Sequence, residues 1–245
     1  MMPALTVRLP NTEQRLGQDE EFCFLVEGGK ERRIRFHDYD EIYSIPGLYE
    51  KLFSELLKCS SPEVISTLLA DQIKRAGDSF ADLHVLDLGA GNGMVGEELR
   101  RLGAGSLVAV DIISEAAAAA ERDRPDVYDA YHVGDIRALP EAAERDLADR
   151  TINCMTCVAA LGFGDIPPTA FQAAYDLVQP GGWVAFNIKD AFLENIEEGG
   201  FAALIRDMMA DGRLDILARH TYTHRLSVSG DELAYVAMVA RKPAD

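Results

Sequence analysis

The chain has 245 residues, of which 48% are hydrophobic and 27% are charged, and its formal net charge is -17. This composition is typical of a globular protein, and the length suits one large domain with appendages, so wholesale disorder is excluded. The acidic excess would repel a phosphate backbone, which disfavours nucleic acid as a partner but leaves small or cationic ligands open. The four cysteines do not form the dense pattern of a disulfide framework.

The N-terminus and the apolar stretches give expectations about location. The first five residues lack a basic segment followed by an apolar one, so we expect no signal peptide. The longest uncharged central stretch, residues 151–164, is too short to span a bilayer. We therefore expect a cytoplasmic protein that does not cross a membrane.

The first third of the chain predicts a small cap. Residues 1–20 show no sustained period and are expected to form a loose arm, and two apolar runs around a Gly-Gly turn predict a hairpin over 21–37. Apolar residues at helical spacing predict a helix over 48–57, and the capping-box pattern Ser60-Ser61-Pro62-Glu63 predicts the start of a second helix. We expect residues 1–82 to act as a lid and not as an independent domain.

From residue 83 short apolar strands alternate with helices, which predicts parallel βαβ units with helices on both faces of one sheet. The expected strands are His84–Leu88, Ser106–Asp111, Ala130–Gly134, Ile152–Val158 and Gly182–Ile188. The expected helices lie near 95–102, 114–122, 138–148, 169–178 and 201–210. Two extended runs, Leu217–Ser227 and Leu233–Arg241, predict an antiparallel hairpin that closes the sheet. Residues 83–245 would then form one α/β domain.

A glycine-rich turn is the strongest local signal in the chain. In Val85-Leu86-Asp87-Leu88-Gly89-Ala90-Gly91-Asn92-Gly93 a strand ends near an acid, and three glycines at alternate positions lead into a helix. Glycine permits a sharp turn and a close approach of the backbone to a ligand. In a doubly wound sheet this turn lies at the carboxyl end of a strand, where ligands bind. We therefore expect the turn, from Gly89 through Ala90 and Gly91 to Gly93, to hold a ligand.

The turn alone does not decide which ligand binds. Residues 91–96 match the pattern G-x-G-x-x-G, and Asp111 follows Gly91 at dinucleotide-fingerprint spacing, so a nicotinamide-dependent oxidoreductase is an alternative. Two features count against it. The first glycine after the strand is Gly89, which puts the fingerprint in the wrong register, and Asp87 would lie beside a diphosphate at a Coulombic cost. The acid favours a cationic ligand such as an ammonium or a sulfonium.

Two further acids end the next two predicted strands. Asp111 follows Leu107-Val108-Ala109-Val110, where its carboxylate can accept both hydroxyls of a ribose, and Asp135 follows the third strand, where it can accept from an exocyclic amine. Each acid alone is compatible with a solvated strand end. Three acids at successive strand ends around a glycine turn point to an adenosyl ligand.

With these motifs the sequence resembles the class I S-adenosylmethionine-dependent methyltransferases, closely over about residues 80–190. The resemblance implies a Rossmann-like, mostly parallel seven-stranded sheet, with S-adenosyl-L-methionine as cofactor and S-adenosyl-L-homocysteine as product. It implies that the turn after Asp87 holds the methionine part, that Asp111 binds the ribose with Ile112 beside the adenine, and that Asp135 and Ile136 bind the adenine. The segments 154–161 and 178–184 resemble the fourth strand with its loop and the turn into the fifth strand.

The sequence departs from the family in places that bear on the acceptor. Asn153 stands where an aspartate is common, and no Asp/Asn-Pro-Pro-aromatic motif follows the fourth strand, although Asp165-Ile166-Pro167-Pro168 is a superficial echo of it. Methylation of bases or amides by that motif is thus disfavoured. We expect methyl transfer to a small-molecule acceptor that the sequence does not identify. A non-catalytic adenosyl-binding module and an NAD(P)-dependent oxidoreductase are the alternatives.

Aromatic and basic side chains give weaker predictions about the site. Tyr39, Tyr43 and Tyr49 could bring aromatic rings toward a cationic cofactor; we expect that contact from Tyr43, and we expect Tyr49 to cover a hydrophobic seam. Four of the five histidines are candidate bases, but structural or surface roles are expected for them, so no catalytic residue is assigned; they are His37, His132, His220 and His224. Asn187 and Lys189 could line an acceptor pocket, although a solvated position is expected for Lys189.

Cys154 and Cys157 have redox-motif spacing but lie within an apolar strand, and not at a helix start that would lower a thiol pKa. We expect them to be core residues, and we expect no metal site because suitably spaced partners are missing. The oligomeric state is left open. An edge of the 21–37 hairpin could pair two copies into a homodimer.

Overall fold

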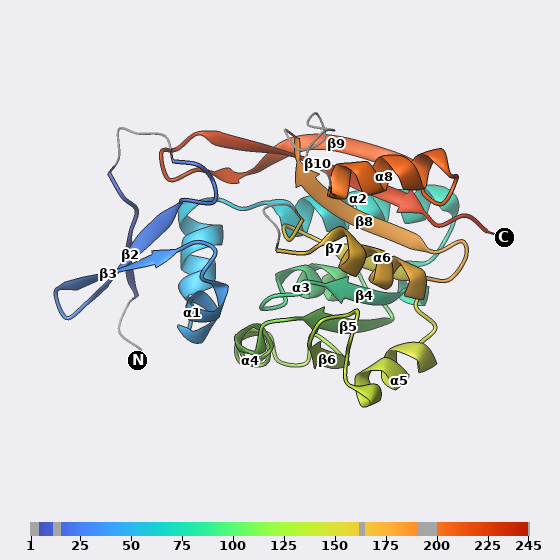
Figure 1. Cartoon of the computed structure of the whole chain (residues 1–245), viewed down its shortest axis with the longest axis horizontal. Helices are drawn as coiled ribbons and strands as arrows, with labels where there is room; N and C mark the ends of the chain where they lie inside the picture. Colours follow the sequence, from blue (N-terminus) through green and yellow to red (C-terminus); the bar gives the residue numbers. More distant parts are fainter. Residues whose placement is uncertain (1–4, 12–15, 162–164, 191–199, 245) are drawn as a thin grey trace.

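The computed structural model describes residues 5–11, 16–161, 165–190 and 200–244. Seven of its strands form one sheet in the order β6-β5-β4-β7-β8-β10-β9 (Figure 1). Their bounds are β4 His84–Leu88, β5 Ser106–Asp111, β6 Ala130–Val133, β7 Cys154–Cys157, β8 Trp183–Lys189, β9 Asp215–Leu226 and β10 Glu232–Arg241. Each strand of this sheet predicted from the sequence is present, and its ends differ from the prediction by at most two residues.

The strand directions confirm the predicted doubly wound α/β fold. β4 runs parallel to β5 and to β7, β5 runs parallel to β6, and β7 runs parallel to β8. β10 is antiparallel to both β8 and β9, so the tail forms the expected closing hairpin. Because the parallel strands share one direction, the segments that follow β4, β5, β6 and β7 meet at one edge of the sheet.

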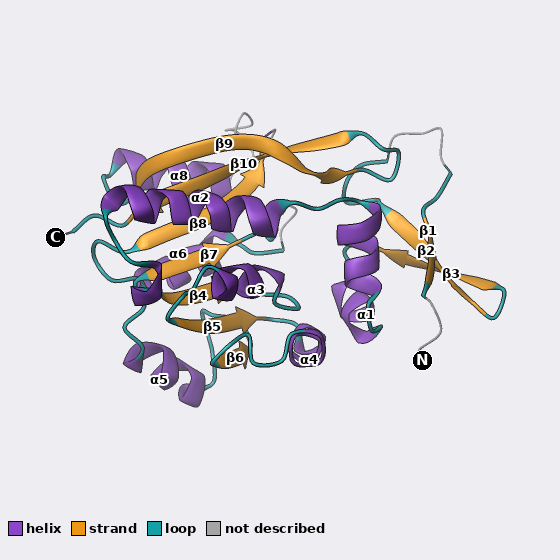
Figure 2. Cartoon of the chain, turned by 180° about the vertical axis from the view of Figure 1, so that it is seen from behind, coloured by secondary structure: helices purple, strands orange, loops and turns teal. Residues whose placement is uncertain are grey.

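Helices cover both faces of the sheet because successive side chains of each strand point to opposite faces. α2 (Ser61–Ala76) and α3 (Met94–Arg101) pack on one face, and α5 (Glu141–Asp149), α6 (Pro168–Leu177) and α8 (Phe201–Ala210) pack on the other (Figure 2). In β4, for example, Leu86 and Leu88 pack on the face covered by α5, α6 and α8, while Val85 packs on the face covered by α2 and α3. α4 (Ser114–Asp123) follows β5, and the short 3-10 helix η2 (Phe80–Asp82) precedes β4.

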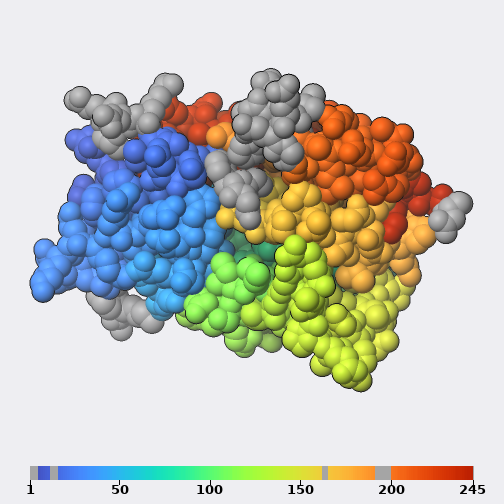
Figure 3. Space-filling view, viewed as in Figure 1, coloured from blue at the N-terminus to red at the C-terminus, as the bar shows by residue number. Residues whose placement is uncertain are grey.

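The N-terminal part forms a separate small layer beside the strand ends. β1 (Thr6–Arg8), β2 (Phe22–Glu27) and β3 (Lys30–Arg35) make an antiparallel sheet, followed by α1 (Tyr39–Ser44) and the π-helix η1 (Glu50–Leu56). The hairpin turn at Gly28 and Gly29 has positive φ at both residues, which glycine adopts without steric cost. In the space-filling view this blue part abuts the green and yellow parts, and the border between them is recessed (Figure 3).

The structure differs from the expectations for this part at three points, although the predicted hairpin and a helical segment near 48–57 are present. The arm over 1–20 contains β1, whose Val7 pairs with Leu25 and packs with the cap core; three residues are too few to show a period. The helical segment near 48–57 is a π-helix, with Leu57 N donating to the carbonyl of Leu52, and it is preceded by a separate helix, α1, which the sequence did not suggest.

The expected capping box at Ser60 is also wrong. The Ser60 hydroxyl does not cap α2 but donates to the carbonyl of Thr223 at 2.8 Å, so it ties the start of α2 to β9. α2 was expected in the cap segment 1–82, yet it packs on β8, β9 and β10 of the main sheet. The division into a lid over 1–82 and a cofactor-binding domain over 83–245 stays a proposal.

Candidate functional site

A cavity lies between the cap and the carboxyl ends of the parallel strands. It is lined by the turns that follow β4, β5, β6 and β7, and closed on the other side by α1 and η1. From the predicted site the lining includes Tyr43, Gly89, Ala90, Gly91, Asp111, Ile112, Asp135 and Ile136. The fold thus brings together residues that are up to 93 positions apart in the sequence. They meet at the carboxyl ends of the parallel strands, where doubly wound folds bind ligands.

Asp111 ends β5 and directs its carboxylate across the glycine turn. Oδ2 accepts from Gly91 N at 2.9 Å, and Oδ1 accepts from Ile113 N at 2.9 Å. Burial raises the pKa of the carboxyl, and these backbone hydrogen bonds oppose the rise. Each carboxylate oxygen retains a second lone pair, so the group can still accept hydroxyl donors from a ligand.

Asp135 is held by an arginine at the cavity rim. Arg137 Nε donates to its Oδ1 at 2.9 Å and Nη2 donates to its Oδ2 at 2.5 Å, and these bonds lower the pKa of Asp135 to about 2. Arg137 Nη1 also reaches Thr169 Oγ1 at 2.9 Å, so it links the segment after β6 to α6. An incoming amine would share Asp135 with this guanidinium.

The turn leaves no room for a side chain at Gly89 or at Gly91. Gly91 has φ +54°, and a Cβ there would lie 2.4 Å from the hydroxyl of Tyr43; at Gly89 it would lie 2.7 Å from Ile166 Cδ1. The tyrosine of the cap therefore touches the turn through the space that glycine leaves open. Ile112 lines the same cavity although it is 66% exposed, which is unusual for a large apolar side chain and fits an apolar ligand face.

Asp87 and Gly93 do not line the cavity. Asp87 is 1% exposed, and its carboxylate accepts from Tyr128 OH at 2.6 Å and from Thr156 Oγ1 at 2.7 Å. Burial raises its pKa to about 6. Gly93, with φ +87°, is the N-cap of α3, and a Cβ there would meet Val127 at 3.2 Å.

Aromatic rings from the cap form one row along the cavity. The ring centroids of Tyr39 and Tyr43 are 6.1 Å apart, those of Tyr43 and Tyr49 are 5.0 Å apart, and Tyr49 is 4.7 Å from Phe53. All four side chains line the cavity, so Tyr49 has a place in the site as well as in the cap core. Burial raises the pKa of all three phenols, so they present neutral rings.

Two arginines of the α4 segment join the cap to the α/β part of the chain beside the cavity. Arg122 Nη1 donates to the carbonyl of Tyr43 at 3.1 Å. Arg124 Nη1 donates to Glu50 Oε1 at 2.8 Å, and the same oxygen accepts from Asn92 Nδ2 at 2.6 Å. η1 is therefore joined directly to the glycine turn, and the tyrosine row is held over the strand ends.

The remaining polar candidates lie elsewhere. Asn187, expected beside an acceptor, is fully buried behind the cavity: its Oδ1 accepts from Ala159 N at 2.7 Å and its Nδ2 donates to Tyr222 OH at 2.6 Å. Lys189 is half-buried at the end of β8 and does not line the cavity. The buried Cys154 and Cys157 are core residues as predicted, and burial raises the pKa of both thiols.

The histidines occupy four different settings. His132 on β6 pairs with Asp146 at 2.7 Å, and His220 is exposed and stacks on Tyr222. His224 is buried with its Nδ1 2.6 Å from Ser61 Oγ, and burial lowers its pKa to about 3. The fourth, His37, lies beside Asp165 at 3.5 Å between Nδ1 and Oδ2.

Sequence reasoning missed some residues that line the cavity. Asp165, Ile166 and Pro167 were dismissed as an echo of a different motif, although an acid and two prolines after a predicted fourth strand were a usable signal. Arg137 was overlooked two positions after Asp135. The charged groups among the described lining residues are Asp111, Asp135, Arg137 and Asp165. Acids outnumber the single arginine, so the cavity favours a cationic ligand.

A family profile described as a methyltransferase domain matches residues 63–234. The chain is 28% identical over 166 residues to the ubiquinone biosynthesis O-methyltransferase of Paraburkholderia phymatum, an alignment that covers 66% of this chain and 67% of that protein. It is 25% identical over 147 residues to the protein of the same name from Colwellia psychrerythraea, covering 60% of this chain and 55% of that one. The chain thus spans little more than half the length of some curated relatives that it matches.

Solved structures show the same fold. The N-methyltransferase NodS from Bradyrhizobium japonicum, in complex with S-adenosyl-L-homocysteine, superposes with a TM-score of 0.57 at 13% identity over 85% of this chain and 98% of that one. An S-adenosylmethionine-dependent methyltransferase from Clostridium acetobutylicum gives 0.54 at 15% identity over 80% and 97%. With the family profile over most of its length, this chain belongs to the methyltransferase-domain family, and its strand order gives it the fold of the S-adenosylmethionine-dependent methyltransferases of known structure.

Proposed function

We propose that the protein transfers the methyl group of S-adenosyl-L-methionine to a hydroxyl oxygen of a small molecule. The main support for the proposal is the cavity at the strand ends. Asp111, Asp135 and the Gly89–Gly91 turn line it on one side, and the row of tyrosines from the cap lines it on the other. The relatives that match in sequence are named as O-methyltransferases, which supports oxygen as the acceptor atom.

The lining residues fit such a donor. Asp111 would accept the ribose hydroxyls, Ile112 and Ile136 would pack on the adenine, and Asp135 would accept its amine. The Gly89–Gly91 turn, which would clash with neighbouring side chains if it carried a Cβ at either glycine, would hold the methionine part. The acidic cavity and the neutral faces of Tyr43 and Tyr49 would favour the sulfonium over an anionic ligand.

In this reaction the main tasks of the protein are to align the acceptor with the methyl group and to exclude water. An in-line displacement at the methyl carbon needs the acceptor oxygen on the side opposite the sulfur, in a space from which solvent is removed. The cap, attached through Arg122 and Arg124, would supply that cover. Methyl transfer to a hydroxyl also needs the hydroxyl proton to leave.

The test is transfer of a labelled methyl group. Purified protein would be incubated with S-adenosyl-L-methionine carrying a labelled methyl group and with panels of small hydroxyl, amine and thiol compounds, and product would be detected by mass. We expect label on hydroxyl compounds together with formation of S-adenosyl-L-homocysteine. Label on amines alone would contradict the choice of oxygen. Cofactor binding without transfer to any panel would support the non-catalytic alternative.

A further inference from the structure

The segment that follows β7 borders two cavities. Val158, Ala159 and Ala160, which form this β7 wall, line the cavity described above. Ala159 and Ala160 also line a second, smaller cavity, whose other lining residues come from the cap, the segment after β7 and the closing hairpin. Ala160 Cβ lies 3.0 Å from where a Cβ of Gly89 would be, so the β7 wall lies against the glycine turn. Because the β7 wall borders open space in two directions, close packing alone does not fix its position.

Ala159 has a backbone conformation that alanine rarely adopts. Its φ is +56°, in the left-handed region, where the Cβ of an L-residue crowds the backbone. The other described non-glycine residues with positive φ are Lys58 and Asp126, and neither lines the cavity. Such conformations persist where the surrounding structure holds them, and they gather at ligand sites. The conformation of Ala159 therefore calls for a contact that holds it.

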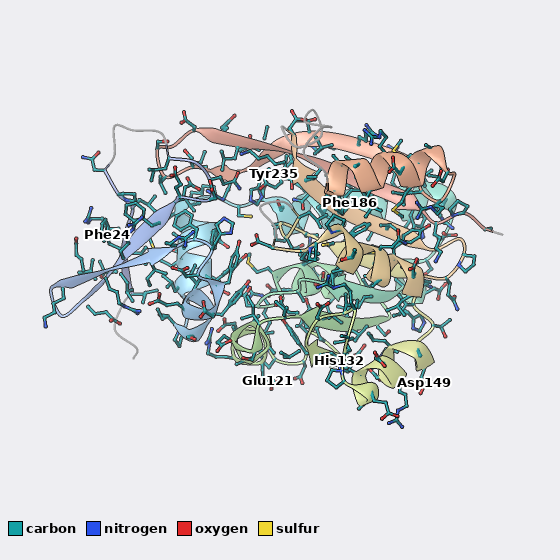
Figure 4. All side chains as sticks on the ribbon, viewed as in Figure 1. Phe24, Glu121, His132, Asp149, Phe186 and Tyr235 are labelled. Carbon is teal, nitrogen blue, oxygen red and sulfur yellow. The ribbon has the colours of Figure 1, made fainter. Side chains whose placement is uncertain are left out.

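That contact comes from Asn187 on β8. The side chain of Asn187 is fully buried, and its Oδ1 accepts from Ala159 N at 2.7 Å. β7 and β8 pair in parallel as far as Cys157 and Phe186, so the amide of Asn187 supplies an acceptor just beyond the end of this ladder. Figure 4 labels Phe186, the neighbour of Asn187, on β8 within the main sheet. The β7 wall is thus attached to a rigid strand through one side chain.

A chain of hydrogen bonds fixes the orientation of this amide. A backbone N–H can only donate, so the oxygen of Asn187 faces Ala159, and its Nδ2 donates to Tyr222 OH at 2.6 Å and to Ser61 Oγ at 3.1 Å. Tyr222 OH and His224 Nδ1 each lie 2.6 Å from Ser61 Oγ. Burial lowers the pKa of His224 to about 3, so its neutral ring can accept at Nδ1. Tyr222 then donates to Ser61 and Ser61 donates to His224, which leaves every group of the chain satisfied.

We propose that Asn187 is a positioning residue, which holds Ala159 in the left-handed conformation and so places the β7 wall against the methionine part of S-adenosyl-L-methionine. The proposal rests on the proposed function, which assigns the Gly89–Gly91 turn to that part of the donor. Because Ala160 lies against Gly89, a change of conformation at Ala159 would alter the space over the turn. Asn187 acts through the backbone of the β7 wall and does not touch the ligand.

Calorimetric titration with three ligands tests the proposal. S-adenosyl-L-methionine and S-adenosyl-L-homocysteine both contain the methionine-derived part. Adenosine lacks it and would bind through Asp111 and Asp135, whose hydrogen bonds do not involve the β7 wall. In Asn187→Leu a side chain of similar size cannot accept from Ala159 N. We expect Kd to rise about tenfold or more for the first two ligands and to change less than about threefold for adenosine.

Two further variants separate the position of the β7 wall from general stability. Asn187→Asp keeps an oxygen opposite Ala159 N and should bind S-adenosyl-L-methionine within about threefold of the wild-type Kd. In the double variant with Asn187→Leu and Ala159→Gly, the glycine adopts the left-handed conformation without steric cost. Affinity for S-adenosyl-L-methionine should recover in part, whereas the free energy of unfolding, measured in urea, should not recover.

Ala159→Pro makes the same test without altering the buried chain of hydrogen bonds. Proline has no N–H and fixes φ at about −65°, so the Kd of S-adenosyl-L-methionine should rise here even if Asn187→Leu does not fold. Asn153→Leu is the matched control. Asn153 Oδ1 accepts from His84 N at 2.8 Å and its Nδ2 donates to the carbonyl of Asp82 at 2.8 Å, at the other end of β7. Its loss should leave all three Kd values unchanged.

The outcomes distinguish this inference from the proposed function. An unchanged Kd for S-adenosyl-L-methionine in folded Asn187→Leu or in Ala159→Pro would overturn the positioning role, and so would an equal rise for adenosine. A wild-type protein that binds adenosine but neither of the two larger ligands, or none of the three, would overturn the proposed function itself.

Discussion

At the scale of single residues, the site depends on a carboxylate that is held by backbone and on a glycine that a tyrosine overlies. Asp111 is 9% exposed and has both carboxylate oxygens on backbone N–H groups, so its position does not depend on flexible side chains. Gly91 donates one of those hydrogen bonds, and because it has no side chain the Tyr43 hydroxyl can lie close to its backbone. Two neighbouring residues thus connect the sheet, the turn and the cap.

Replacing Asp111 by Asn should weaken binding of S-adenosyl-L-methionine. Loss of the charge removes charge-assisted hydrogen bonds to the ribose, so we expect Kd to rise about tenfold to a hundredfold, or roughly 1.4–2.8 kcal/mol. Isothermal titration calorimetry measures the change. The matched control is Asp126→Asn, an exposed position at φ 65° that asparagine adopts readily, where Kd should not change. An unaltered Kd in Asp111→Asn would contradict the role of this residue.

Replacing Gly91 by Ala should disturb the cap as well as the turn. The left-handed conformation costs about 1–2 kcal/mol for alanine, and the new Cβ would displace the Tyr43 hydroxyl. We expect donor binding to be lost and the free energy of unfolding to fall by more than in Gly47→Ala, where φ is +77° and the space is open. Urea unfolding and calorimetry check both points. If the double variant with Gly91→Ala and Tyr43→Phe is no more stable than Gly91→Ala alone, the contact between the new Cβ and the Tyr43 hydroxyl does not cause the loss of stability.

At the scale of elements, the cap contacts the α4 segment beside the cavity and also the closing hairpin, where the buried Glu21 pairs with Arg225 of β9. α1 packs on α4 through Tyr43, Ala116 and Ala119, and the Arg124–Glu50 pair fixes η1. Tyr43 takes part in these contacts and also lines the cavity, so we expect ligand binding to stabilise the closed cap. Elements that open easily are those with few buried apolar contacts to the rest of the fold.

Hydrogen exchange should detect this coupling. Addition of S-adenosyl-L-methionine should slow amide exchange over residues 39–56, which carry the tyrosine row, because a filled cavity stabilises the closed cap. Residues 141–149 of α5 line neither cavity and serve as the internal control. Equal exchange in the cap with and without the donor would show that α1 and η1 do not respond to binding.

The main sheet and the hairpin of β2 and β3 could be predicted from sequence, whereas the rest of the cap could not. Alternating apolar strands and helices such as β4, β5 and α3 carry strong local periods, and their order fixes where their loops meet. β1 is three residues long and α1 is six, which is too short for a period to appear. Asp87 was expected in the cavity because it stands at a strand end. The direction of its side chain depends on Tyr128 and Thr156, which are distant in sequence.

At the scale of the whole molecule, two buried groups give the stability opposite dependences on pH. His224 has a folded pKa of about 3, below the ordinary value, so the unfolded chain binds more protons and stability is lost as the pH falls below about 6.5. Asp87 has a folded pKa of about 6, above the ordinary value, so its contribution is present at low pH and is lost as the pH rises through 6. The two effects oppose each other between about pH 4 and pH 6.

Replacing His224 by Asn should therefore reduce the fall in the free energy of unfolding between neutral and mildly acidic pH. Between pH 7 and pH 5 the wild-type protein should lose about 2 kcal/mol more of its free energy of unfolding than the variant does, at about 1.4 kcal/mol per pH unit below the ordinary pKa. Urea unfolding at several pH values measures this difference. His220→Asn, at an exposed position on β9, should follow the wild-type curve. Parallel curves for His224→Asn and wild type would contradict a buried neutral imidazole.

The folded structure shows where part of the net charge of -17 lies. Asp111, Asp135 and Asp165 gather around one cavity with a single arginine among the charged lining residues, so part of the acidic excess selects a cationic ligand. In the described part of the chain, no helix is long and apolar enough to cross a membrane.

The central claim, that this cavity binds S-adenosyl-L-methionine, is tested most directly by calorimetric titration of the purified protein. S-adenosyl-L-methionine, S-adenosyl-L-homocysteine, NAD and NADP would be titrated under the same conditions. We predict saturable one-to-one binding of the two adenosyl compounds with micromolar Kd, and no binding of NAD or NADP. Saturable binding of NAD or NADP with no binding of S-adenosyl-L-methionine would contradict the account.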